Sequence, residues 1–114
     1  MKFPYRTKYK SVATIINGER FDSKREAARY CDLILLEKVG TIMNLRRQVT
    51  HPLIVNGEKV SSYRCDFMYQ DSEGKTVIED VKGYQNAKDP FTRLYRLKVA
   101  ILAATTGLQV TEVK

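Results

Sequence analysis

The stretch between residues 48 and 82 constrains the fold more than any other part of this chain of 114 residues. Three runs rich in strand-favouring residues follow one another there, at about 48–55, 60–69 and 75–82. Asn56-Gly57 separates the first two runs, and this dipeptide is typical of tight hairpin turns. A polar turn at 70–74 separates the second run from the third. The pattern predicts an antiparallel meander of three strands.

Apolar residues at helical spacing predict a first helix ahead of this meander, at about 23–39. Asp22 or Ser23 is the expected N-cap, and Gly40 ends the pattern. Before this helix, a further Asn-Gly pair at 17–18 predicts a short hairpin. The predicted buried face of the helix holds Ala27, Tyr30, Cys31, Ile34 and Leu35. The predicted solvent face holds Arg25, Arg29 and Asp32.

A second helix is predicted after the meander, at about 90–106. Asp89 can cap it, Pro90 suits its first turn, and Gly107 ends it. A closing strand is expected at about 108–113, and the order strand, helix, strand predicts a parallel crossover. The expected fold class is therefore α/β, a mixed sheet flanked by helices in the order β-hairpin, α, βββ, α, β.

The composition favours one folded domain with an anionic partner. We expect a basic arm at 1–10 and a single domain at 11–114, a length that suits one core. Lys and Arg outnumber Asp and Glu by 20 to 13, a net charge of +7. In so small a protein this favours nucleic acid first and an acidic membrane face second, whereas the alternative is simple solubility.

Several classes of function are disfavoured by what the sequence lacks. No apolar run approaches the length of a membrane span, and the first residues lack the apolar core of a signal peptide, so we expect no membrane partner and a cytoplasmic location. Cys31 and Cys65 form no C-x-x-C pair and are expected in the core, which argues against a thiolate zinc site. His51 is the only histidine, which argues against nucleases that bind their metal through histidines. No glycine-rich phosphate loop occurs, which argues against ATP hydrolysis.

Acidic and basic side chains converge where the meander ends. Asp80 and Lys82 share a face of their strand, because successive side chains point to opposite faces. Asp66, on the neighbouring strand, can add a second carboxylate beside them. Two carboxylates suit a hard cation such as Mg²⁺, and a lysine beside the ion can orient or deprotonate a water. This group can hydrolyse a phosphodiester, whereas the alternative is an ordinary Asp/Lys pair on the surface of a sheet.

Glu79 and Glu26 are further candidates for the acidic residues of this site. Glu79 adjoins Asp80 and points to the opposite face of a regular strand, although a bulge would reverse the assignment. Glu26 completes a capping box with Ser23. It also lies at the edge of the apolar face of its helix, beside Tyr30, from where it can face the open end of the sheet.

The order α-βββ-α-β, with an aspartate in the second strand of the meander and Asp-x-Lys in the third, resembles the PD-(D/E)XK nuclease superfamily. The resemblance covers about residues 20–113. The stretches F-D-S-K-R-E-A, Y-R-C-D-F and V-I-E-D-V-K-G-Y resemble a small phage-encoded group of that superfamily, some members of which are suspected recombination or junction nucleases. One departure is that Cys65 stands where the proline of the motif would precede Asp66.

The resemblance implies a restriction-endonuclease-like core and metal-dependent hydrolysis of DNA. It makes Asp66, Asp80 and the backbone carbonyl of Val81 the metal ligands, with Mg²⁺ as the ion and Mn²⁺ as a substitute. It makes Lys82 the residue that positions the attacking water. In several branches of the superfamily a glutamate of the first helix reaches the metal, so Glu26 is a further catalytic and ligand candidate beside its capping role.

Other residues are candidates for contact with DNA. Gln48 resembles a glutamine near the active site of some relatives, or it is an ordinary polar strand residue. Lys98 falls within the apolar arc that Leu94 and Leu97 help to form on the second helix, so it either reaches the scissile phosphate or a catalytic carboxylate, or extends to solvent. Tyr84 either stacks on a base or packs on the strand end. The basic candidates for lining a DNA groove are Lys88, Arg93 and Arg96.

We therefore expect a small Mg²⁺-dependent deoxyribonuclease, an endonuclease rather than an exonuclease. No element for reading bases is obvious, so we expect it to recognise a branch, flap or Holliday junction in phage recombination or replication, within the infected host cell. A homodimer would suit paired cuts at a junction. Two alternatives stay open: a non-catalytic nucleic-acid-binding module with this fold, and a protein whose basic surface binds an acidic protein partner.

Overall fold

The protein is described by a computed structural model that covers residues 14–21, 23–83 and 85–114. Its elements are β1 (Thr14–Ile16), β2 (Glu19–Phe21), α2 (Lys24–Lys38), β3 (Met43–Val55), β4 (Glu58–Gln70), β5 (Thr76–Val81), α3 (Pro90–Thr106) and β6 (Val110–Val113). This is the predicted order of hairpin, α, βββ, α, β. The expected basic arm at 1–10 lies outside the described residues.

The main sheet of the described residues has four strands in the order β3-β4-β5-β6. The pairs β3–β4 and β4–β5 are antiparallel, which confirms the meander. β5 and β6 are parallel and are joined through α3, which confirms the crossover. The bounds of α3 are those predicted, because the Asp89 side chain accepts a hydrogen bond from the Phe91 N–H and Gly107 takes a φ of 79°.

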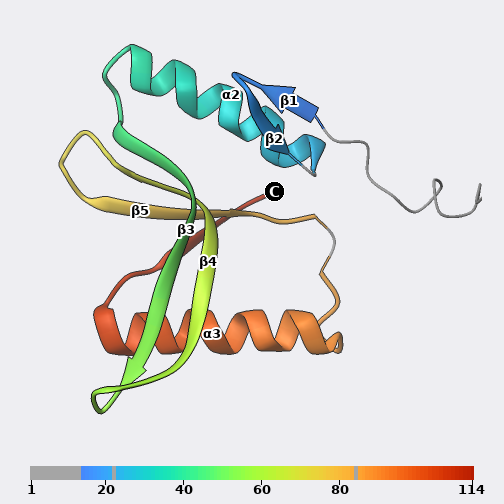
Figure 1. Cartoon of the computed structure of the whole chain (residues 1–114), viewed down its shortest axis with the longest axis vertical. Helices are drawn as coiled ribbons and strands as arrows, with labels where there is room; N and C mark the ends of the chain where they lie inside the picture. The colour runs from blue at the N-terminus through green and yellow to red at the C-terminus, as the bar shows by residue number, and fades with distance from the viewer. Residues whose placement is uncertain (1–13, 22, 84) are drawn as a thin grey trace, which may run out of the picture.

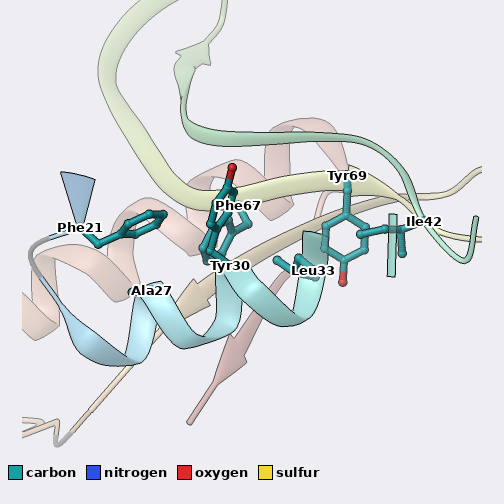
Figure 2. Packing of buried hydrophobic residues seen from close by; sticks show 7 residues of the cluster. All are labelled: Phe21, Ala27, Tyr30, Leu33, Ile42, Phe67 and Tyr69. Atoms are coloured by element: carbon teal, nitrogen blue, oxygen red, sulfur yellow. The ribbon is translucent and has the colours of Figure 1, made fainter. Parts of the chain in front are cut away.

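The two helices lie on opposite sides of this sheet (Figure 1). α2 and the β1–β2 hairpin cover one face with a core that includes Phe21, Tyr30 and Phe67, whose rings gather over the helix in Figure 2. α3 covers the other face with a core that includes Ile78 and Leu102. Neither helix in the described ranges combines the length and apolar character that a crossing of a bilayer would need.

The prediction of which face of α2 is buried was partly wrong. Leu35 and Cys31, predicted to be buried, are exposed, whereas Leu33 is fully buried. Arg29, predicted to face solvent, turns toward the sheet and bonds the buried Glu79. The helix is therefore rotated so that the side carrying Arg29 and Leu33 meets the sheet. The buried carboxylate of Glu79 explains this orientation, because a buried charge needs a partner.

The predicted strand bounds and the predicted apolar face of α3 also differ in part from the structure. β3 begins at Met43 rather than near residue 48, and β4 and β5 also shift by one or two residues at their ends. On α3, Leu94 and Leu97, predicted within the apolar arc, are largely exposed because only part of that arc packs on the sheet. Cys65 is buried, as predicted.

Candidate active site

At one position along β3 and β4, the side chains that pointed toward one helix begin to point toward the other. Phe67 packs in the core beneath α2, whereas Cys65 packs in the core beneath α3, as does Val49 on β3. Residues two apart on a regular strand share a face, so the alternation is interrupted between Cys65 and Phe67. The interruption lies between the paired positions Arg47–Phe67 and Val49–Cys65. Gln48 lies there with a φ of 52°, a conformation that few residues other than glycine adopt.

Asp66 lies at this interruption, beside Asp80 of β5. The β4–β5 ladder ends with the pair Phe67–Glu79, and side-chain bonds continue where it stops. Asp80 Oδ1 accepts a hydrogen bond from the Asp66 N–H at 2.9 Å. Asp66 Oδ2 accepts one from the Val81 N–H at 2.8 Å. Each carboxylate is therefore fixed by the backbone of the other residue's strand, and the two acids are held side by side.

The environment of Asp80 disfavours the ionised form of its carboxylate. The residue is only 3% exposed, and its Oδ2 accepts a further hydrogen bond from the Tyr63 hydroxyl. Burial raises the pKa of Asp80, and the charge of Asp66 raises it further, while the Tyr63 and Asp66 hydrogen bonds and the nearby charge of Lys82 act in the opposite direction. Within the described ranges neither aspartate forms a salt bridge. The pair therefore carries negative charge that no salt bridge within the described residues neutralises.

Lys82 is held beside the aspartates without pairing to them. Its Nζ lies 3.7 Å from the centroid of the Tyr95 ring, which is the geometry of a cation–π contact. Burial raises the pKa of Tyr95, and the charges of Asp80 and Glu112 raise it further, so the ring stays neutral. Lys82 and the two aspartates line one cavity of about 320 Å³. The three residues predicted from the Asp and Asp-x-Lys pattern therefore meet in one place.

Glu26 lies next to this group rather than within it. Its Oε2 accepts hydrogen bonds from Gln48 Nε2 at 2.9 Å and from an Arg47 guanidinium N–H at 3.2 Å. Burial raises the pKa of Glu26, and the charge of Asp66 raises it further. Its backbone N–H is capped by Ser23 at 3.3 Å, so the capping position does not occupy the carboxylate. Across the described residues no three acidic, His or Cys side chains gather as a metal cluster, so Glu26 is not brought into the pair.

Glu79 points to the opposite face from Asp80, as the strand register predicts. Arg29 binds it through two N–H groups, at 2.8 and 2.7 Å, and the Tyr69 hydroxyl donates to the same carboxylate. Glu79 is 2% exposed and therefore belongs to the packing of α2 on the sheet. Its charge is neutralised by Arg29, which distinguishes it from the aspartate pair.

The predicted DNA-contact residues divide into two groups. Lys98 is half-buried and lines the same cavity as the aspartates, and Gln48 is bound to Glu26. The exposed basic residues, away from the cavity lining, are Lys88, Arg93 and Arg96. Tyr84 lies outside the described residues.

Five further residues line the cavity and were not predicted as site residues: Tyr63, Arg64, Phe91, Leu94 and Tyr95. Once Lys98 is placed at the site, helical spacing indicates three of them, because residues three, four and seven apart share a face of a helix. No sequence pattern indicated Tyr63, because regular alternation along β4 would place its side chain on the face opposite Asp66, and only the interruption of the strand brings it to the aspartates.

The fold and this cavity define an α/β protein with a paired-carboxylate site between a sheet and a helix. A family model described as "Protein of unknown function (DUF1064)" matches residues 6–105, so the chain belongs to that family. Neither the curated proteins nor the solved structures contain a significant match to the chain.

Proposed function

We propose that this protein is a metal-dependent DNA nuclease with a restriction-endonuclease-like core, of the PD-(D/E)XK kind. One observation carries the proposal: the carboxylates of Asp66 and Asp80 are fixed against each other and share a cavity with Lys82. A carboxylate pair that forms no salt bridge within the described residues is the donor set that attracts a hard divalent cation.

The donor chemistry fits such an ion. A carboxylate oxygen that accepts one hydrogen bond keeps a second lone pair, so the bonds to the Asp66 and Val81 N–H groups leave acceptor capacity on both aspartates. Asp66, Asp80 and the Val81 carbonyl would hold Mg²⁺ or Mn²⁺, and Glu26 would act from beside this set. The ion would neutralise the scissile phosphate, acidify a bound water and stabilise the leaving oxygen.

The side chains of this chain would then position the reactants. Lys82, held over the Tyr95 ring, would orient the attacking water and stabilise negative charge that develops on the phosphate. Lys98 and Arg64 line the same cavity and would contact neighbouring phosphates. Phosphate contacts of this kind fix the position of DNA without reading its sequence.

Branched DNA is the substrate that we propose, cut endonucleolytically at a flap or junction. The net charge of +7 supplies attraction to the backbone of DNA of any sequence. Recombination or replication of phage DNA in the host cytoplasm would offer such branches, and a homodimer would match paired cuts.

The test is cleavage of end-labelled linear, flap and four-way-junction DNA by the purified protein. We expect cleavage with Mg²⁺ or Mn²⁺ and none with EDTA. Asp66→Asn and Asp80→Asn should each lower the rate by more than about 100-fold, because even the loss of an outer-shell partner of a metal costs 10- to 100-fold.

Asp32→Asn is the matched control, because it removes the same charge from an exposed position on α2 and should keep full activity. Cleavage that survives EDTA, or that persists in Asp80→Asn, would contradict the proposal. DNA binding without cleavage under every metal condition, unchanged in Asp66→Asn, would instead favour the non-catalytic binding module.

A further inference from the structure

One stripe of α3 forms the helical wall of the candidate active site. Phe91, Leu94, Tyr95 and Lys98 line the cavity, at the i, i+3, i+4 and i+7 spacing of a single helix face. Phe91 is 82% exposed and Leu94 is 48% exposed. A single exposed apolar residue needs no explanation, but here two lie together beside a carboxylate pair and basic residues.

Phe91 also borders a second hollow. This hollow has a volume of about 200 Å³ and is lined by Lys82, Gln85, Phe91, Thr92 and Tyr95. Lys82, Phe91 and Tyr95 line both spaces. The Phe91 ring therefore stands at the boundary between the cavity that contains the aspartates and a hollow whose described lining has no acidic group.

The lining of the second hollow suits a flat ring that carries hydrogen-bonding groups. Two aromatic side chains supply apolar surface, and Thr92 and Gln85 supply a hydroxyl and an amide. The Gln85 amide is held in place, because its Oε1 accepts a hydrogen bond from Arg96 at 3.4 Å and its Nε2 donates one to Glu112 at 3.5 Å. The ammonium of Lys82 adds a positive charge at the side shared with the aspartate cavity.

We propose that Phe91 stacks on an unpaired nucleobase adjacent to the phosphate that lies at Asp66 and Asp80. This inference rests on the proposed nuclease function and narrows its substrate to DNA with a single-stranded or unstacked nucleotide at the cleavage site. A base in the interior of a duplex has both faces covered by its neighbours and cannot stack on this ring, whereas an unpaired base can present a free face. Positive charge combined with an exposed aromatic ring is the chemistry by which proteins bind single strands.

The test is binding of a short single-stranded oligonucleotide that contains the fluorescent base 2-aminopurine, in EDTA so that no cleavage occurs. Phe91→Ala should weaken binding by about 5- to 150-fold, the range for loss of one base–aromatic stack, and should abolish quenching of the 2-aminopurine fluorescence. Phe91→Trp should retain both. Since the side chain is 82% exposed, its removal should leave the fold intact, as circular dichroism would verify.

Leu97→Ala is the matched control. Leu97 is an apolar residue of α3 that is 57% exposed and lines neither hollow. Its replacement should change neither the affinity nor the quenching, which separates stacking from a general loss of apolar surface.

The outcomes separate this inference from the nuclease proposal. Metal-dependent cleavage together with unchanged binding by Phe91→Ala would overturn the stacking role and leave the nuclease intact. Quenching that depends on Phe91, without cleavage of any substrate, would support stacking and overturn the nuclease. Failure of the wild-type protein to bind the oligonucleotide would overturn the inference. So would concentration-dependent self-association that Phe91→Ala abolishes while oligonucleotide binding is unchanged, because the face would then be an interface between copies.

Discussion

Asp80 combines deep burial with a neighbouring carboxylate of the same charge. A buried ionised carboxylate is tolerated when hydrogen bonds compensate its lost hydration. For Asp80 these come from the Asp66 N–H and the Tyr63 hydroxyl. The repulsion between the Asp66 and Asp80 carboxylates remains, and a divalent cation would neutralise the negative charge that causes it.

Replacing Tyr63 by Phe should therefore destabilise the protein. The change keeps the ring and removes one donor from the buried Asp80 carboxylate, so the free energy of unfolding should fall by about 1.5–3 kcal/mol, the range for hydrogen bonds to charged groups. Urea denaturation at neutral pH measures the loss.

Tyr30→Phe provides the comparison. Its hydroxyl donates to Glu19 at 2.9 Å, but the Glu19 side chain is 44% exposed and water can replace the lost donor. We expect a loss below about 1 kcal/mol for this variant. Equal losses for the two variants would contradict the view that Asp80 depends on Tyr63.

At the scale of elements, the interruption of β3 and β4 decides which residues reach the site. The positive φ of Gln48 accompanies the change of face, and Asp66 lies beside Asp80 there. The sequence predicts both strands from their β-rich runs and their turn residues. It does not predict the interruption, because glutamine carries no preference for the left-handed conformation that glycine would have signalled. The bond from Tyr63 to Asp80 was missed for this reason.

The orientation of α2 has a comparable cause. Hydrophobic spacing predicted the helix and part of its buried face, including Ala27 and Tyr30. The spacing could not reveal that Arg29 pairs with Glu79, because that ion pair joins residues 50 positions apart. The two charges, read separately from sequence, each suggest a solvent position.

Arg29→Met should weaken the docking of α2 on the sheet. The change leaves the Glu79 carboxylate buried without its cation, so we expect the free energy of unfolding to fall by about 2–4 kcal/mol, somewhat below the usual cost for a fully buried pair because Arg29 is 25% exposed. Thermal or urea denaturation checks this value.

Arg25→Met is the control for this variant. Arg25 lies one helical turn before Arg29 and is exposed, so its replacement should change stability by less than about 0.5 kcal/mol. If Arg29→Met were equally mild, the ion pair with Glu79 would not be what orients the helix.

At the scale of the whole molecule, the helices cover opposite faces of one sheet (Figure 1). The candidate active site lies on the α3 face, because α3 residues line its cavity. The order of the elements could be predicted because caps and Asn-Gly turns mark their ends. Asp66, Asp80 and Lys82 could be placed together because strand register alone relates them. Helical spacing relates Phe91 and Tyr95 to Lys98, but the contact of this helix face with the aspartates could not be predicted, because the packing of α3 against the strands depends on contacts between distant parts of the chain.

We propose that the paired aspartates hold a divalent metal ion. Crystals grown with manganese, at a concentration that supports DNA cleavage in solution, test it through the anomalous scattering of the ion. We predict an anomalous peak at coordination distance from the carboxylates of both Asp66 and Asp80, and no such peak in crystals of Asp66→Asn. Crystals that diffract well and contain no manganese between these two side chains would contradict the account.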